Sequence, residues 1–199
     1  HTHTTSFPLS LSLSTSRRLF SVAFVAPSLS LSLSRSMANF VRDHLGPTLH
    51  KEHPKVKIIG FDHNKDHVLE WTKGLYADPE ARKYFDGVGV HWYGGLNTHN
   101  LDATHEVDPS KFILATEACN CVGNVVYSSP SLSAWWTRAE KLALDILEDL
   151  LHWAVGWIDW NLLVDTSGGP NHLKNLCDAN IIVDPDETKG YGTPLITQA

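Results

Sequence analysis

The stretch FILATEACN (residues 112–120) is the point from which the rest of the sequence can be interpreted, because its mostly apolar start runs directly into a carboxylate. Three interpretations of Glu117 are open. It is a solvated residue at the end of a strand, or it lies beside a metal pair formed by Cys119 and Cys121, or it is a catalytic carboxylate at the mouth of a barrel. The surrounding sequence has to distinguish among them.

The composition is that of an ordinary globular protein. With 199 residues the chain is long enough for one domain with a real hydrophobic core. The net charge of −6 argues against a nucleic-acid-binding surface, so no nucleic-acid partner is expected. Each of the seven tryptophans offers a large apolar face and one N–H donor, which suits stacking against sugars or filling a core. No run approaches the ~18 apolar residues that would span a bilayer.

The cysteines argue against a metal site. Cys119, Cys121 and Cys177 are too few for a disulfide framework, and the odd number leaves at least one free thiol in a monomer. Cys119 and Cys121 would share one face of a strand. No second Cys/His pair stands at zinc-ligand spacing, so we expect no metal.

The first 36 residues differ from the rest of the chain. Runs such as SLSLSLSRS (28–36) are Ser/Leu low-complexity sequence, and we exclude residues 1–36 from the fold as disordered or artefactual. A targeting segment is the alternative, because Arg17-Arg18 followed by LFSVAFVA (19–26) resembles the start of a signal peptide. We expect the folded domain to occupy residues 37–185 and a truncated tail to occupy 186–199.

Apolar runs alternate with helical patterns after Met37. A first helix over 38–53 is predicted to be interrupted or to end near Gly46-Pro47. Short apolar runs predict strands, and a polar loop follows the strand at 87–93. Helical spacing, or a capping pattern with Asp78 as N-cap and then Pro79, predicts helices. The strands are 55–64, 87–93, 111–120 and 154–163, and the helices are 67–76, 81–85 and 131–153. This order predicts a parallel sheet, as half of an eight-stranded barrel or as a small doubly wound sheet.

The predicted helix 131–153 has the clearest pattern in the chain. Leu142, Ile146, Leu150 and Trp153 recur at helical spacing, while the acidic residues fall largely elsewhere. We therefore expect these four side chains to form the buried face.

Polar and aromatic residues gather at the carboxyl end of every predicted strand, which is where parallel α/β proteins bind ligands. The side-chain types suit a saccharide, since hydroxyls need carboxylate, amide or imidazole partners and sugar faces need aromatic platforms. Glu117 could then attack an anomeric carbon. The alternative is that Trp157 and Trp160 are core residues and Asp159 is a capping group. The four strand ends are 62–64, 91–93, 117–119 and 157–161.

Residues 38–185 resemble the later part of the catalytic domain of the glucosylceramidases (lysosomal acid β-glucosidases), which are family-30 glycoside hydrolases. The matching stretches follow the family's order and spacing. They are LGPTL (45–49), DPEARKY (78–84), GVGVHWY (87–93), ATEAC (115–119), RAEKLALDILEDL (138–150), GWIDWNL (156–162), GGPN (168–171) and IIVD (181–184).

The resemblance implies an α/β fold, the C-terminal half (strands five to eight) of a (β/α)8 TIM barrel. It implies a retaining glycosidase that uses no cofactor or metal and whose nucleophile is Glu117. It also implies which residues are near the nucleophile or line the sugar pocket. Those residues are Asp62, His91, Trp92, Tyr93, Cys119, Trp160 and Asn175.

One part of the family's machinery is missing from this sequence. The family's acid/base glutamate lies in an Asn-Glu-Pro motif on strand four, and no Asn-Glu pair occurs in the 199 residues. Most of the family's β-sandwich is missing as well. We therefore expect this polypeptide by itself to have no useful glucosidase turnover, because the lost acid is usually worth about 10²–10⁴-fold.

The resemblance implies hydrolysis of glucosylceramide to glucose and ceramide, as part of sphingolipid metabolism. The alternatives are a related enzyme acting on another β-glycoside such as xylan, and a catalytically dead carbohydrate-binding protein. By resemblance, the partners would be glucosylceramide or another β-glucoside, a lipid membrane surface and an activator protein. The location would be lysosomal or secreted, although the sequence shows no clean signal peptide.

Overall fold

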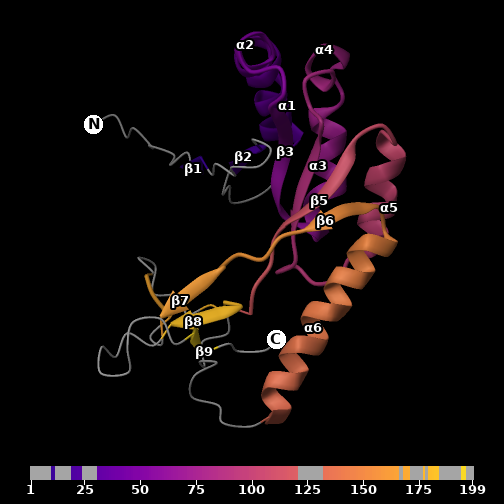
Figure 1. Ribbon diagram of the computed structural model, residues 1–199. Coiled ribbons are helices and arrows are strands. Elements are labelled where there is room, and N and C mark those ends of the chain that lie inside the picture. The colour runs from indigo at the N-terminus through magenta and orange to yellow at the C-terminus, as the bar shows by residue number, and fades with distance from the viewer. Residues whose placement is uncertain are drawn as a thin grey trace, which may run out of the picture.

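The computed structural model describes residues 10–11, 19–23, 31–120, 132–165, 168–170, 177, 179–183 and 194–195 (Figure 1). Its main feature is a six-stranded sheet in the order β1-β2-β3-β4-β5-β6. The strands are β1 (Ser10–Leu11), β2 (Leu19–Ala23), β3 (Lys57–Asn64), β4 (Gly87–His91), β5 (Phe112–Glu117) and β6 (Ala154–Trp157). Neighbouring strands from β2 to β6 are parallel, and β1 pairs antiparallel with β2. The predicted parallel sheet is confirmed.

Helices connect the successive strands of this sheet. They are α1 (Leu31–Phe40), the π-helical turn η1 (Val41–Leu45), α2 (Gly46–Glu52), the 3₁₀ turn η2 (Lys65–His67), α3 (Val68–Leu75), α4 (Pro79–Arg82), α5 (Thr98–Val107) and α6 (Leu132–Leu151). The predicted cap of α4 is confirmed, because the Asp78 carboxylate accepts a hydrogen bond from the Glu80 amide at 2.9 Å. Among the described helices, none combines the length and apolarity needed to cross a membrane.

The first helical stretch begins earlier than predicted. α1 starts at Leu31 and buries Ser34, and β2 pairs with β3, so the fold includes residues that the boundary at Met37 excludes. The interruption predicted near Gly46-Pro47 is the π-helical turn η1, which precedes Pro47 in the first turn of α2. Gly46 is required there, since an added Cβ would lie 2.3 Å from the Tyr84 ring.

The polar loop predicted after residue 93 contains a helix, α5, over residues 98–107, at the position where the alternation of strands and helices leaves room for one. The only strongly buried apolar side chain of α5 is Leu101, so its sequence carries almost no helical hydrophobic pattern. Packing against α3 supports the helix instead. This is a case in which tertiary contacts outweigh local pattern.

The hydrophobic core lies between the parallel strands and the helices that precede α6. Ile58, Val88, Val90 and Ile113 contribute from β3, β4 and β5. Phe61 at the bulge of β3 and large side chains from the connecting segments complete the core, and the chief of the latter are Trp71, Leu75, Tyr76, Phe85 and Leu101. The core therefore fixes the three central strands, whose carboxyl ends carry the candidate site.

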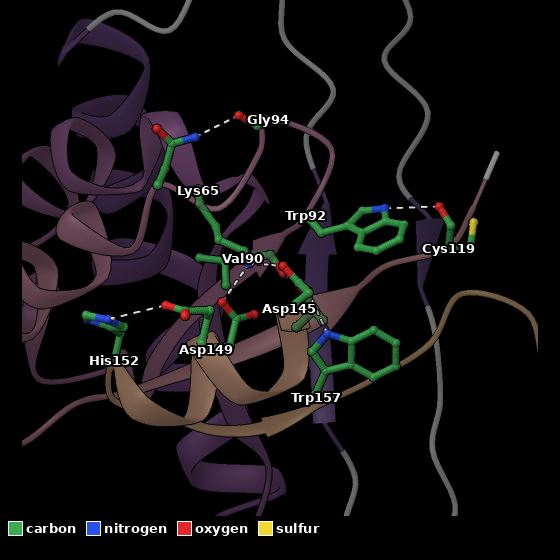
Figure 2. Close-up of polar contacts among 12 residues, drawn as sticks. Lys65, Val90, Trp92, Gly94, Cys119, Asp145, Asp149, His152 and Trp157 are labelled. Atoms are coloured by element: carbon green, nitrogen blue, oxygen red, sulfur yellow. Dashed lines mark hydrogen bonds and ion pairs between the residues drawn. The ribbon is translucent and has the colours of Figure 1, made fainter. Parts of the chain in front are cut away.

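The predicted helix 131–153 is confirmed as α6, but its buried face differs from the prediction. Asp145 and Asp149 are the buried side chains, and both bind the fully buried Lys65 amine, at 2.5 and 2.6 Å (Figure 2). We call Lys65, Asp145 and Asp149 the lysine trio. The side chains of Leu144, Leu147, Leu150 and Leu151 are exposed instead.

The prediction of a buried stripe on α6 is therefore wrong for Leu150 and for Trp153, just beyond its end, which are both exposed. Leu142 and Ile146 are partly buried and line a groove of about 500 Å³ together with Trp157. A buried amine left without a partner would be strongly destabilising, and the observed rotation of α6 directs two carboxylates to Lys65.

The predicted strand 154–163 also differs from the structure. β6 ends at Trp157, and β7 (Leu163–Asp165) begins a second sheet with β8 (Ile181–Val183) and β9 (Pro194–Leu195), which is set apart from the larger sheet (Figure 1). Between them the chain still follows β5, because the Ile158 and Trp160 amides bond to the carbonyls of Ala115 and Ala118 at 2.9 Å. This connection brings Trp160 beside the end of β5.

Candidate active site

The end of β3 contains a bulge that sets the direction of Asp62. Gly60 pairs with Val88 and Asp62 pairs with Gly89, so Phe61 is an extra residue between them. Phe61 has φ of 59°, a left-handed conformation that is uncommon for an aromatic residue and persists only where the surroundings enforce it. The Phe61 ring is buried against Trp71, which supplies that constraint. Bulges of this kind re-aim side chains next to functional sites.

Asp62 meets Thr116 across the middle strand β4. The Thr116 hydroxyl donates a hydrogen bond to Asp62 Oδ1 at 2.6 Å, although the two residues lie on β3 and β5. Gly89 lies between them, and a Cβ at this position would be 2.9 Å from the Thr116 side chain and 3.1 Å from Asp62 Oδ1. The glycine therefore provides the space in which the side chains of the two outer strands meet.

His91 lies between two carboxylates. Its Nε2 is 2.8 Å from Asp62 Oδ1, and its Nδ1 is 3.6 Å from Glu117 Oε1. We call Asp62, His91 and Glu117 the histidine trio. A second bulge makes this possible, because Val90 pairs with Ala115 and His91 pairs with Glu117, which leaves Thr116 as an extra residue. Two successive residues of β5 can then approach the same cluster.

Glu117 is a partly buried carboxylate with opposing influences on its pKa. Burial raises the pKa of Glu117, and the nearby Asp62 charge adds to this effect, while His91 and a hydrogen bond from Tyr93 lower it. The structure thus places Glu117 at the carboxyl end of β5, as predicted. Its one-fifth exposed side chain leaves it accessible from the edge of the sheet.

The aromatic residues after β4 enclose Cys119. The Tyr93 hydroxyl is 3.4 Å from Cys119 Sγ, and the Trp92 indole N–H donates to the Cys119 carbonyl at 3.0 Å (Figure 2). Burial is the largest of the effects that raise the pKa of Tyr93 well above its ordinary value, and the hydrogen bond with the Cys119 thiol is the second largest. Tyr93 therefore remains a neutral hydroxyl that can donate to Glu117.

The remaining predicted residues lie farther along the chain. Trp160 is about half exposed beside Ala118, so its ring is available rather than buried as a core residue. Asp159 accepts hydrogen bonds from the Trp160 amide and from Asn180, at 2.8 and 3.0 Å, and burial raises its pKa. Trp157 donates to Asp145. Asn175 and Cys121 lie outside the described residues.

The cysteines agree with the expectation that an odd number leaves at least one thiol outside any disulfide, because Cys177 is disulfide-bonded while Cys119 is a buried thiol that is not. In the part of the chain that the structure describes, no three His, Cys, Asp or Glu side chains are grouped as metal ligands.

Sequence reasoning missed Thr116 and Gly89. Thr116 sits inside an apolar run, where a threonine is an ordinary strand residue, and its role depends on a bulge that no local pattern announces. Gly89 gave a usable signal, since a glycine inside a strand often marks a close approach of neighbouring groups.

The fold and site define the class of protein. Helices connect parallel strands, and carboxylates, imidazole and aromatic side chains gather at the carboxyl edge, as in the active sites of α/β barrels. A family model described as the glycosyl hydrolase family 30 TIM-barrel domain matches residues 23–198, and the chain belongs to this family. The predicted barrel class is thereby confirmed, and the match begins before Met37.

Similar proteins agree with this assignment. The chain is 33% identical over 160 residues to the lysosomal acid glucosylceramidase of Mus musculus, covering 79% of this chain and 31% of that protein. A Caenorhabditis elegans relative, provisionally named glucosylceramidase 3, is 40% identical over 166 residues, covering 81% and 31%. The chain thus spans about a third of the length of these relatives.

Two solved structures share the fold. The structure of SrfJ from Salmonella typhimurium has a TM-score of 0.71 and 26% identity, covering 82% of this chain and 37% of that one. The structure described as the endo-β1,6-glucanase BT3312 has a TM-score of 0.69 and 27% identity, covering 82% and 36%. Both similarities extend over most of the present chain but only part of the larger proteins.

Proposed function

We propose that this chain carries the nucleophile side of a retaining β-glucosidase site of the glucosylceramidase type. The observation that carries the proposal is Glu117, held at the carboxyl edge of a family-30 sheet by His91 and Tyr93. The name of the mouse relative supports glucosylceramide as the substrate, with glucose and ceramide as products, and a lysosomal location. A membrane surface and an activator protein are partners suggested by the family resemblance alone.

In the proposed reaction, a Glu117 oxygen attacks the anomeric carbon and the bond to the leaving oxygen breaks, which forms a glycosyl-enzyme ester. A second carboxylic acid protonates the leaving oxygen and later takes a proton from water. Tyr93 and His91 contact the attacking carboxylate and oppose the rise that burial causes in the pKa of Glu117. The half-exposed Trp160 ring is suited to stack on the sugar face.

The acid/base residue is not supplied by a recognisable motif in these residues, since they contain no Asn-Glu pair. We therefore keep the proposal that the 199-residue polypeptide has no useful turnover by itself. Robust hydrolysis of an aryl β-glucoside that disappears in Glu117→Gln would contradict it.

A β-glucan is a second candidate substrate, because a structurally similar protein is described as an endo-β1,6-glucanase. Hydrolysis rates on glucosylceramide and on a β1,6-glucan would discriminate the two, provided that the assay uses a form of the protein that turns over.

The nucleophile can be tested without the missing acid. A 2-deoxy-2-fluoro-β-glucoside with a dinitrophenolate leaving group needs no protonation to react, and its glycosyl-enzyme hydrolyses slowly. Mass spectrometry should find one added fluoroglucosyl group on the peptide that contains Glu117. Glu117→Gln should remain unlabelled, while the matched control Asp159→Asn should label.

Two outcomes would overturn the nucleophile assignment. Labelling of another carboxylate would show that Glu117 has a different role. Sugar binding in a folded chain that never becomes labelled would instead support a catalytically dead carbohydrate-binding protein.

A further inference from the structure

Asp62 is already occupied by partners within the protein. Its Oδ1 is bound by the Thr116 hydroxyl at 2.6 Å and lies 2.8 Å from His91 Nε2, and its side chain is about 10% exposed. A carboxylate that binds a sugar normally directs its oxygens to the cavity. The contacts of Asp62 point instead to His91.

The Asp62 contact determines which nitrogen of His91 faces Glu117. Because a carboxylate accepts hydrogen bonds, the proton of a neutral His91 is assigned to Nε2, and Nδ1 is then the nitrogen that lies 3.6 Å from Glu117 Oε1. The orientation of the ring thus couples Asp62 to Glu117.

We propose that Asp62 and Thr116 are positioning residues that hold His91 against Glu117, and that Asp62 is not a sugar ligand. Thr116 fixes the Asp62 carboxylate, Asp62 fixes the tautomer and direction of His91, and His91 presents Nδ1 to Glu117. The absence of a side chain at Gly89 gives this arrangement its space. The relevance to catalysis rests on the proposed function, whereas the coupling itself does not.

The groups around Glu117 allow a test in which two explanations predict opposite changes in the pKa of Glu117. The titratable groups that face the cluster are Asp62 and His63 from β3, His91 and Tyr93 from β4 and its following turn, and Cys119 after β5. The Asp62 charge raises the pKa of Glu117, and His91 lowers it. If Asp62 acts only through its charge, Asp62→Asn lowers the pKa of Glu117. If Asp62 acts by positioning His91, the same substitution raises it.

The experiment is a pH titration of the full chain with ¹³C-labelled glutamate side chains, in which Glu117→Gln identifies the Glu117 carboxyl signal. We expect Asp62→Asn to raise the pKa of Glu117 by roughly 1 unit, as for the loss of a neighbouring opposite charge. Thr116→Val, which changes no charge and little volume, should raise it in the same direction, and Thr116→Ser should restore the wild-type value.

A fall in the pKa of Glu117 in Asp62→Asn, or no change in a folded Thr116→Val chain, would overturn the proposal. A merely structural role of Thr116 would change the denaturation midpoint without moving this titration. If Asp62→Asn does not fold, Thr116→Val decides the question. The fluoroglucoside experiment is separate, because Glu117 can fail to label while the coupling persists, and it can label while the coupling is absent.

Discussion

Asp62 and Lys65 stand three positions apart at the end of β3, and each belongs to a trio that combines two carboxylates with one basic group. In the histidine trio the side chains are 10%, 12% and 21% exposed for Asp62, His91 and Glu117, and the His91–Glu117 contact is 3.6 Å. In the lysine trio no side chain is more than 4% exposed, and both contacts are 2.6 Å or shorter.

The two trios differ in how completely their charged groups are bound by neighbouring side chains. The lysine trio is completed by Trp157, which donates to Asp145 at 2.9 Å (Figure 2). Asn100 also donates to the Lys65 carbonyl at 3.1 Å. The histidine trio leaves Glu117 with a longer contact and an accessible edge. Two trios that each contain two acids and one base therefore differ in effect, since one joins α6 to the turn after β3 and the other leaves a carboxylate accessible at the edge of the sheet.

Removing Lys65 is the change expected to have the largest effect. Lys65→Ala would leave Asp145 and Asp149 buried without their cation, which typically costs about 3–5 kcal/mol in the free energy of unfolding. Chemical denaturation at neutral pH measures this loss. The control Lys57→Ala removes an exposed ion pair with Asp86 and should cost at most about 1 kcal/mol. Equal losses in the two variants would show that the lysine trio is not structural.

The second largest expected effect is a pH dependence of the free energy of unfolding that is caused by Asp149. Burial, which outweighs the Lys65 contact, raises the pKa of Asp149 to about 6, above its value of 3.8 in the unfolded chain. A raised folded-state pKa contributes stability that is complete below the unfolded value and is lost as pH rises through about 6. The free energy of unfolding should therefore fall by about 2–3 kcal/mol between pH 4 and pH 7 from this residue.

Asp149→Asn is the variant that tests this pH dependence. It should flatten the decline and be more stable than the wild type at pH 7, because a neutral amide avoids the cost of ionising a buried carboxyl. Asp43→Asn, at an exposed ion pair, is the control that should keep the wild-type slope. A slope unchanged in Asp149→Asn would exclude the assignment to Asp149.

Gly89→Ala should damage the histidine trio and leave the lysine trio intact. The added Cβ would lie 2.9 Å from Thr116, and overpacking of this kind costs about 1–3 kcal/mol. Gly156→Ala, whose Cβ would be 3.2 Å from a Leu114 methyl group, is a milder control. Denaturation curves give the stability of both, and the fluoroglucoside label on Glu117 should be slower in Gly89→Ala alone. Normal labelling in Gly89→Ala would show that the Asp62–Thr116 contact is not needed.

Glu117→Gln should have the smallest effect on stability. Burial raises the pKa of Glu117, so a neutral side chain of the same shape removes a cost and the free energy of unfolding should change by less than about 1 kcal/mol. Thermal and chemical denaturation at pH 7 check this. A loss comparable to that of Lys65→Ala would remove the distinction between the two trios.

The sequence predicted the features that depend on neighbouring residues. Apolar runs located β3, β4 and β5, and polar residues at their carboxyl ends correctly placed Asp62, His91 and Glu117 at one edge. These predictions succeed because strand periodicity and parallel topology are enough to bring strand ends together.

The errors arise where distant partners decide the outcome. The leucine pattern of α6 was misleading because the buried face is chosen by Lys65, which is 80 residues from Asp145 in sequence. α5 has too few apolar residues to show its period, and Thr116 acquires its role from a bulge. None of these causes lies within a local window of sequence.

The bulge at Phe61 has a consequence for insertions and deletions in β3. Side chains alternate between the two faces of a strand, so the parity of the count up to Asp62 decides which face each later residue occupies. With the extra residue present, Asp62 reaches Thr116 and His91, while Lys65 lies beyond the strand in the turn η2 and reaches α6. Deletion of one residue before Asp62 would turn its carboxylate to the opposite face of β3, away from Thr116 and His91. The number of residues in β3 up to Asp62 thus decides whether the histidine trio can form.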